Sequence, residues 1–493
     1  MSGSVGGGRT FLGIDIGTSL TKAALFDDRG DLVGEAEQPT TLAHSAGGHV
    51  EQDLDDVVAS VAEVVRTTLA DLGPGEAAPE LVAVTGQGDG CWLVDSAGRA
   101  VRPAVSWMDG RAGALTGRWE RDGVADAYYR VDGNMLFPGS MAGVLATLDS
   151  DEPQVLGRAS TAHHCVGAVF QRLTGMRATD PSDVALPFDE AAGGYSDRAL
   201  SLTGLTGRRG LLPGVVRPVP VARLSGAGAR VTGLVEGTPV SAGPYDLPAC
   251  AIGAGVGEVG DGVLTVGTTL ACQVLVDHVD TSGTPTGNHL AMPVPGRWLR
   301  ALPAMVGTAS LDWVLDLVGM RHAAVGEALR STSPGAGGVE VLPYFAPSGE
   351  RAPFVDARAR GQLTGLSLTT GRADLVRGVC EGVAFAARDC FDRAGLTGQL
   401  SVCGGGTRSP EWMQVFADVL GRPLRLARAA GIGARGAMLT HLQVAGQDPD
   451  IAAWTGSDRF VEPDPARSRT YEELFARYLA HQQSARQLWR DVG

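Results

Sequence analysis

Lysine is almost absent from this sequence, since Lys22 is the only one in 493 residues and arginine supplies nearly all of the positive charge. Acidic residues outnumber basic ones, and the formal net charge is −14. An acidic balance of this size argues against nucleic acid or an anionic membrane surface as the partner, because both are negatively charged. Neither class of partner is therefore expected.

Long apolar runs are also lacking, and no stretch is long enough to span a bilayer. The start, MSGSVGGGRT, does not have the charged-then-apolar pattern of a signal segment. We therefore expect a cytoplasmic protein in which residues 1–10 form a disordered tail.

The seven cysteines form no CxxC pair, which excludes the usual dithiol and zinc-ribbon spacings. His163 and His164 are adjacent, but cysteine and acidic residues do not accompany them at the spacing of a metal site. The sequence thus predicts reduced, mostly packed thiols and no metal role for the two histidines.

The chain is too long for one hydrophobic core, and its length suits two large domains. Hydrophobic residues make up 44% and charged residues 19%, which is typical of a globular protein. Glycine is abundant, with 70 residues. Residues 40–48 are expected to form a loop, and residues 217–233 a surface connector.

The stretch FLGIDIGTSLTKAALFD, residues 11–27, predicts two short strands joined by a turn. The backbone N–H groups of the turn Gly17-Thr18-Ser19 can point at phosphate oxygens, and Asp15 just before it can hold a hydrated Mg²⁺. An ordinary hairpin has the same pattern, so this stretch alone does not decide between the two. Lys22 is a further candidate for the phosphates, although chance survival under a bias against lysine is the simpler explanation.

A second copy of this hairpin occurs at residues 264–277, with Gly267, Thr268 and Thr269 at the turn and Thr265 in the place of Asp15. An internal repeat over such a distance indicates two copies of one folding unit. The pair of hairpins resembles those of the actin, heat-shock ATPase and sugar-kinase superfamily. The resemblance implies an α/β fold of two RNase H-like domains with an inter-domain cleft.

The segment TGQGDGCW, residues 85–92, follows a predicted strand, and ligands in open α/β sheets gather at such strand ends. Gln87 and Asp89 offer an amide and a carboxylate that together can bind substrate hydroxyl groups, while a glycine-rich turn over a core tryptophan is the structural alternative. Trp107 and Asp109 are further substrate candidates. A buried tryptophan with a local Asp–Arg pair explains the segment WMDGR equally well.

Three consecutive glycines, Gly404, Gly405 and Gly406, follow a predicted buried strand. They precede a helix that Ser409 starts and that is predicted to run from Pro410 to Leu420. Without side chains, this turn lets a flat ring or a phosphate approach the backbone. It is not a dinucleotide fingerprint, and it fits an adenosine pocket. Gln414 is a candidate for the flank of that pocket, with a solvated helix face as the alternative.

Asp246 is the candidate general base. It follows a Gly-Pro turn and opens a helical stretch of small residues, in the crossover between the two repeat units. A carboxylate there can accept the proton of a hydroxyl group that attacks the γ-phosphate of ATP. An aspartate at a helix start is more commonly an N-cap, and its place in the crossover is what favours the catalytic role.

Nearly the whole chain resembles the FGGY carbohydrate kinases. The resemblance is carried by GIDIGTSLTKAALFD, RLTGMRATDPSD, GPYDLPACAIGAG, TVGTT and, most specifically, GQLTGLSLTTGRADLVRGVCEGVAFAARD followed by CGGGTRSPEWMQVFADVLGRP. It implies an ATP- and Mg²⁺-dependent transfer of phosphate to a hydroxyl group of a sugar or polyol. The resemblance also implies that Asp246 is the base and that Asp15 lies near the metal. It further implies that the turns at Thr18 and Thr268 bind the phosphates and that Gly405 and Gly406 contact adenosine.

The domains expected from the repeat and the resemblance are an N-terminal domain over 11–253, a C-terminal domain over 254–450 and a helical tail over 451–493. The chain departs from the family patterns at Gly378 and Cys380, and residues 134–148 lack the Lys and Trp of the first signature. The segment TGQGDGCW looks most like that of the erythritol kinases in this family. A tetritol such as erythritol is therefore the favoured substrate.

Other functions stay open at this point: a xylulose- or ribulose-type ketose kinase, an actin-like ATPase that needs no sugar, and a sugar sensor that kept the fold. The presence of Asp15, Asp246 and both turns favours an enzyme. The sequence gives neither the hydroxyl group that is phosphorylated nor the oligomeric state, for which a homodimer is one option.

Overall fold

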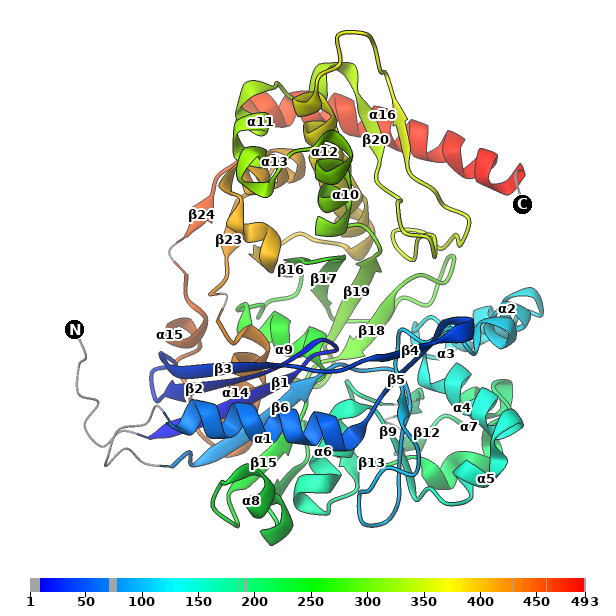
Figure 1. Ribbon diagram of the computed structural model, residues 1–493, viewed down its shortest axis with the longest axis vertical. Coiled ribbons are helices and arrows are strands. Elements are labelled where there is room, and N and C mark those ends of the chain that lie inside the picture. The colour runs from blue at the N-terminus through cyan, green and yellow to red at the C-terminus, as the bar shows by residue number, and fades with distance from the viewer. Residues whose placement is uncertain are drawn as a thin grey trace.

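The computed structural model describes residues 9–70, 78–184, 186–189, 193–428, 430–457 and 459–491. Most of the expected N-terminal tail, residues 1–8, lies outside these ranges. The described chain forms two lobes, each built on one sheet, which lie one above the other in Figure 1.

The first sheet has the strand order β14-β15-β6-β1-β2-β3. Its central strand β1 pairs antiparallel with β2 and parallel with β6. Two helices cover one face, because their apolar stripes share a core with β1, β2 and β6. The bounds are β1 (Thr10–Ile16), β2 (Leu20–Asp27), β3 (Leu32–Pro39), β6 (Leu81–Gly86), β14 (Val221–Arg223), β15 (Pro239–Ala242), α1 (Leu54–Ala70) and α6 (Cys165–Thr174).

The second sheet, with the order β18-β19-β17-β16-β22-β23-β24, repeats this arrangement. Its strand β16 pairs antiparallel with β17 and parallel with β22, as β1 does with β2 and β6. The repeat in the sequence is therefore a repeat in the fold. The bounds are β16 (Gly262–Val266), β17 (Leu270–Val276), β18 (Asn288–Ala291), β19 (Trp298–Ala304), β22 (Leu400–Cys403), β23 (Leu424–Leu426) and β24 (Phe460–Val461).

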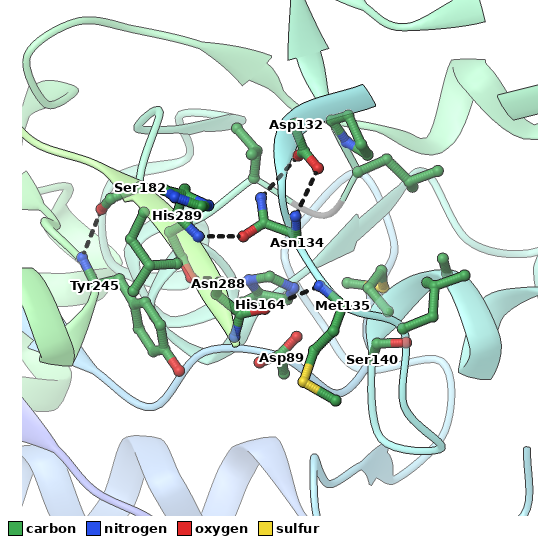
Figure 2. A pocket seen from close by; sticks show the side chains of 18 of the residues that line it. Asp89, Asp132, Asn134, Met135, Ser140, His164, Ser182, Tyr245, Asn288 and His289 are labelled. Atoms are coloured by element: carbon green, nitrogen blue, oxygen red, sulfur yellow. Dashed lines mark hydrogen bonds and ion pairs between the residues drawn. The ribbon is translucent and has the colours of Figure 1, made fainter. Parts of the chain in front are cut away.

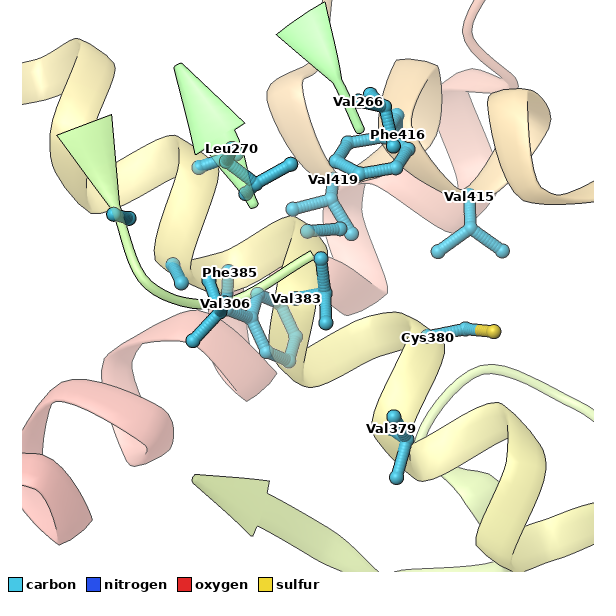
Figure 3. Close-up of a cluster of buried hydrophobic side chains, with 14 of the residues drawn as sticks. Val266, Leu270, Val306, Val379, Cys380, Val383, Phe385, Val415, Phe416 and Val419 are labelled. Atoms are coloured by element: carbon cyan, nitrogen blue, oxygen red, sulfur yellow. The ribbon is translucent and has the colours of Figure 1, made fainter. Parts of the chain in front are cut away.

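The core of the second lobe forms where α10 (Thr308–Val318), α12 (Arg372–Ala394) and α13 (Pro410–Leu420) pack on this sheet. Figure 3 shows Val266 and Leu270 meeting Val383 of α12 and Phe416 of α13 in this core. Helix α13 has the bounds that the sequence predicts, because the Ser409 hydroxyl caps its start. The last helix, α16 (Pro465–Asp491), adds Tyr471, Tyr478 and other side chains to the same core.

Two helices join the lobes. Helix α14 (Ile432–Val444) packs on the first sheet, although in the chain it lies between β23 and β24 of the second sheet. Helix α9 (Asp246–Gly253) packs on the second sheet and against α14, so closely that a Cβ on Gly436 would lie 1.9 Å from the Ala249 carbonyl oxygen. Glycine lets the two backbones meet, and the expected range 254–450 thus contains a helix that covers the first sheet.

Two segments predicted to be irregular contain regular structure. Residues 40–48 include β4 (Ala43–Ser45), which pairs with β5 (His49–Gln52). Residues 217–233 include β14 and α8 (Gly226–Thr232), whose small residues show no apolar periodicity. Helix α8 is held instead by close packing, since a Cβ on Gly228 would lie 2.4 Å from the Leu173 carbonyl oxygen.

A mainly helical layer beside the first sheet has its own core. It comprises β7 (Trp92–Val94), β8 (Ala104–Val105), α2 (Gly113–Arg121), α3 (Val124–Asp132), α4 (Met141–Asp151), α5 (Pro153–Leu156), β9 (Thr161–His163), β10 (Ala178–Thr179), β11 (Phe188–Asp189), β12 (Gly194–Tyr195), α7 (Asp197–Leu202) and β13 (Gly214–Val215). The remaining elements are α11 (Val325–Ser331), β20 (Glu340–Leu342), β21 (Gln362–Thr364) and α15 (Ile451–Thr455).

All seven cysteines are free thiols, and all except Cys250 are buried. Within the described ranges, we find no helix whose length and apolar character would let it cross a bilayer.

Candidate active site

The first hairpin turn is held from the side by a closed set of hydrogen bonds. The Thr18 hydroxyl donates to Gln87 Oε1 at 2.9 Å and accepts from Trp107 Nε1 at 2.9 Å. Gln87 Nε2 donates to Gln52 Oε1, and Gln52 Nε2 donates to the Thr18 carbonyl oxygen. The structure thus brings together Thr18, Gln87 and Trp107, which were predicted separately, and the Gln87 amide helps to hold the turn.

The N–H groups of this turn take no part in that network. The Gly17 N–H donates to the Leu20 carbonyl oxygen at 2.9 Å, whereas those of Thr18 and Ser19 have no protein acceptor among the described residues. Successive unpaired N–H groups in a turn form a concave anion site. The exposed ammonium of Lys22, on β2, pairs with Glu37 at 3.9 Å.

The second turn is braced by the start of α10. The Thr308 N–H donates to the Gly267 carbonyl oxygen at 2.8 Å, and the Ala309 N–H donates to that of Thr268 at 3.3 Å. The N–H groups of Thr268 and Thr269 have no acceptor within the described chain. Both turns therefore offer the same pair of free donors.

Cys250 on α9 lies where strand ends of the two sheets come together. Its thiol lies close enough to Asp15 on β1 and Cys403 on β22 for both to raise its pKa, with burial as the main cause. Cys403 in turn contacts Thr265 of β16, with 3.4 Å between sulfur and oxygen. The carboxyl ends of β1, β16 and β22 therefore meet around α9, the helix that Asp246 begins.

Asp246 lies among other carboxylates at this meeting point. Burial raises its pKa well above the usual value, and the charges of Asp15, Asp183 and Asp89 raise it further. Its Oδ1 is buried and accepts no hydrogen bond from any described residue. The residue before it, Tyr245, is the N-cap, so capping does not explain the position of Oδ1.

Asp15, the next-to-last residue of β1, belongs to this group of carboxylates. Burial raises its pKa, and the charge of Lys22 offsets part of the increase. A Cβ on Gly433 of α14 would lie 2.4 Å from Asp15 Oδ2, so only glycine leaves room for the carboxylate. Within the described chain, no cluster of three His, Cys, Asp or Glu side chains forms a complete protein cage for a metal ion.

A cavity of about 370 Å³ opens at the glycine turn of the second lobe. Gly404 has φ +95°, and a Cβ there would lie 2.5 Å from the Val266 carbonyl oxygen, whereas a Cβ on Gly405 would meet nothing within 4 Å. The lining residues are Thr308, Leu311, Asp312, His322, Val325, Gly405, Gly406, Arg408, Ser409 and Trp412. Gln414 is not among them, because its amide donates to Asp418 and to the Glu462 carbonyl oxygen.

A smaller cavity of about 80 Å³ lies between the first lobe and β18 of the second (Figure 2). Asp89 and Tyr245 face it, and Tyr245 packs so closely on the TGQGDG turn that a Cβ on Gly88 would lie 2.4 Å from its ring. Asp89 has φ +54°, a left-handed conformation that aspartate adopts at a cost. Burial raises the pKa of Asp89, and His164 lowers it.

The structure does not place Asp109 in this cavity. Its carboxylate accepts from the Val50 N–H at 2.6 Å and from the Arg111 side chain at 2.8 and 2.9 Å, and it is 1% exposed. The local Asp–Arg pair that the alternative predicted is therefore present, and neighbouring donors occupy this carboxylate.

Other cavity residues were missed by sequence reasoning. They come from distant parts of the chain: Tyr128, His164, Asp183, Tyr245, Asn288 and His289. Tyr245 could have been found, because it precedes the predicted base, whereas no local signal points to β18. His164 was considered only as a metal ligand.

This chain has the features of an ATP-dependent phosphotransferase built on the actin and hexokinase fold. These features are the two repeated units, the joining helix that carries Asp246 and the two hairpin turns with free N–H groups. Comparison with protein families shows which family of this class the chain belongs to. The FGGY family of carbohydrate kinases matches with its N-terminal domain over residues 10–253 and its C-terminal domain over residues 264–442. The chain belongs to this family and is a sugar or polyol kinase.

Individual relatives cover nearly the whole chain. Erythritol kinase of Brucella abortus is 33% identical over 98% of this chain and 97% of its own, and xylulose kinase of Escherichia coli is 28% identical over 86% and 87%. The crystal structure of xylulose kinase from Rhodospirillum rubrum is 27% identical, covers 98% of this chain and 100% of its own, and has a TM-score of 0.87.

Proposed function

We propose that this kinase transfers the γ-phosphoryl group of ATP to a hydroxyl group of a tetritol such as erythritol, with Asp246 as general base. The observation that carries the proposal is the buried, unpartnered Oδ1 of Asp246, which directly follows Tyr245, a residue that lines the small cavity. A base must lie within reach of the proton that it accepts and needs a free oxygen to accept it.

The choice of a tetritol has separate support. The cavity is small, about 80 Å³, which suits a short acyclic substrate better than a large one. The relative that is 33% identical is an erythritol kinase, and the family's xylulose kinases make a ketose the second candidate. The Asp89 carboxylate would accept hydrogen bonds from substrate hydroxyl groups.

The chain's residues also fit Mg²⁺ and ATP. Mg²⁺ is usually held by one or two carboxylates together with phosphate and water oxygens, and Asp15 offers such a carboxylate beside the phosphate turns. The bound ion would neutralise charge on the phosphates. The free N–H groups of Thr18, Ser19, Thr268 and Thr269 would bind phosphate oxygens, and the glycine turn would hold adenosine.

A substrate panel tests this function. ADP release in a coupled assay is expected to be fastest, at equal concentration, with erythritol among tetritols, pentitols, glycerol and ketoses. A preference for xylulose or ribulose would overturn the tetritol assignment and leave the general base untouched. ADP release at the same rate without any of these compounds would favour an ATPase instead.

The adenosine cavity gives a second prediction. Gly405→Leu places a side chain in open space toward the cavity, so we expect the KM for ATP to rise about tenfold or more, as for loss of one good contact or more. The melting temperature and the KM for the polyol should stay unchanged. An unchanged KM for ATP would show that adenosine binds elsewhere.

A further inference from the structure

His164 is the one imidazole in the small cavity that is anchored at one nitrogen and unpartnered at the other. Its Nδ1 lies 2.8 Å from Asp183 Oδ1, and its side chain is 6% exposed. Its Nε2 is buried and has no hydrogen-bond partner among the described residues. A buried polar atom without a partner lowers stability unless a ligand satisfies it.

The other polar groups around the cavity are mostly used within the protein. Asn288 Oδ1 accepts from the Met135 N–H, and Asn134 Oδ1 accepts from the His289 N–H, as Figure 2 shows. The Asp89 carboxylate, by contrast, accepts no hydrogen bond from any described residue. His164 Nε2 and the Asp89 carboxylate are therefore unmatched polar groups in the lining, together with the hydroxyl groups of Tyr128 and Tyr245, which have no hydrogen-bond partner among the described residues.

We propose that His164 is a substrate-contacting residue, whose Nε2 donates a hydrogen bond to one polyol hydroxyl group while Asp89 accepts a hydrogen bond from that group or its neighbour. A hydroxyl group can donate and accept at once, so a carboxylate and an imidazole N–H together satisfy it. This inference rests on the proposed function and adds a specificity residue to it.

The surroundings of His164 favour a donor at Nε2. Burial lowers its pKa, but Asp183, Asp89 and Asp180 outweigh burial and raise it above the usual value. Asp183 can only accept, so Nδ1 carries a proton, and in the imidazolium Nε2 carries one too. The neighbouring His163 differs, because it does not line the cavity and its Nε2 pairs with Gln171.

The test separates the two nitrogens. An asparagine amide reaches about as far as Nδ1, so His164→Asn keeps the contact to Asp183 and removes Nε2. A glutamine amide reaches about as far as Nε2, so His164→Gln keeps the donor in the cavity. His278→Asn is the matched control, since His278 pairs with Asp277 at 2.9 Å on the surface.

The probes are erythritol and two triols that each lack one of its hydroxyl groups. Butane-1,2,4-triol lacks a secondary hydroxyl group, and butane-1,2,3-triol lacks a primary one. With erythritol, His164→Asn should lower kcat/KM about 10- to 100-fold, mainly through KM, as expected for a lost charged hydrogen bond. With at least one triol the same substitution should change kcat/KM less than about threefold, because the contact is already missing. His164→Gln should recover part of the loss, and His278→Asn should change nothing.

Equal losses by His164→Asn with all three probes would overturn the inference while leaving the kinase function in place. Absence of erythritol phosphorylation by the unaltered protein would contradict both the tetritol assignment and this contact. Melting temperatures of both His164 variants should stay near that of the unaltered protein, and a kinetic loss that follows a melting-temperature loss would also contradict the inference.

Discussion

Asp246→Asn is expected to lower kcat about 10³-fold, within the range that positioned general bases contribute, and to leave ATP binding unchanged. The amide keeps the size of the carboxylate but cannot accept the proton of the attacking hydroxyl group. Under the proposed function, the buried and unpartnered Oδ1 is the oxygen that would accept this proton. The measurement is steady-state kcat with erythritol, together with calorimetric titration of ATP.

The matched control is Asp197→Asn. Asp197 is also the first residue of a helix, α7, but its side chain is 92% exposed and pairs only with Arg209 on the surface. Its kcat should change less than twofold. A kcat for Asp246→Asn above a tenth of the normal value would exclude Asp246 as the base.

Gly436→Ala is expected to lower the free energy of unfolding by about 3 kcal/mol, the upper part of the usual cost of overpacking. Its Cβ would lie 1.9 Å from the Ala249 carbonyl oxygen, and both partners are helix backbone, which cannot turn aside as a side chain can. Helix α9 must shift, and Asp246 at its start must shift with it. Urea denaturation and kcat with erythritol measure the two effects.

Gly117→Ala serves as the control for this substitution. Gly117 lies within α2, where a Cβ would meet only Arg121 Nη1 at 3.6 Å, an ordinary contact. The change should stabilise the protein by about 0.5–1 kcal/mol, because alanine loses less backbone entropy in a helix than glycine. Equal effects of the two substitutions would contradict the close helix contact.

The repeat of the two hairpins was predictable from the sequence, because it depends on local residue order that each copy preserves. Helix α13 was predictable to the residue, since its cap and its Pro at the first turn are local signals. The placement of α14 was not predictable, because no local signal in its sequence indicates which sheet its buried residues cover. The close contact of its Gly436 with α9 fixes the position of the helix, and this contact becomes visible only in the structure.

The candidate site likewise contains residues that the sequence predicts and residues that it does not. Asp15, Asp246 and the three glycines stand in recognisable local patterns. Gln87 and Trp107 were predicted for the substrate, and the structure shows both side chains hydrogen-bonded to Thr18 of the first hairpin turn. The cavity residues on β18 come from the other lobe, and no local pattern links them to Asp89.

The central claim is that phosphate moves from ATP to a polyol in the space between the lobes, and product analysis tests it most directly. ATP and erythritol are incubated with the enzyme, and ADP, inorganic phosphate and phosphorylated polyol are measured by ³¹P NMR. The account predicts one erythritol phosphate per ADP and no ADP release without polyol. ADP accompanied by equal inorganic phosphate, with or without polyol, would contradict it.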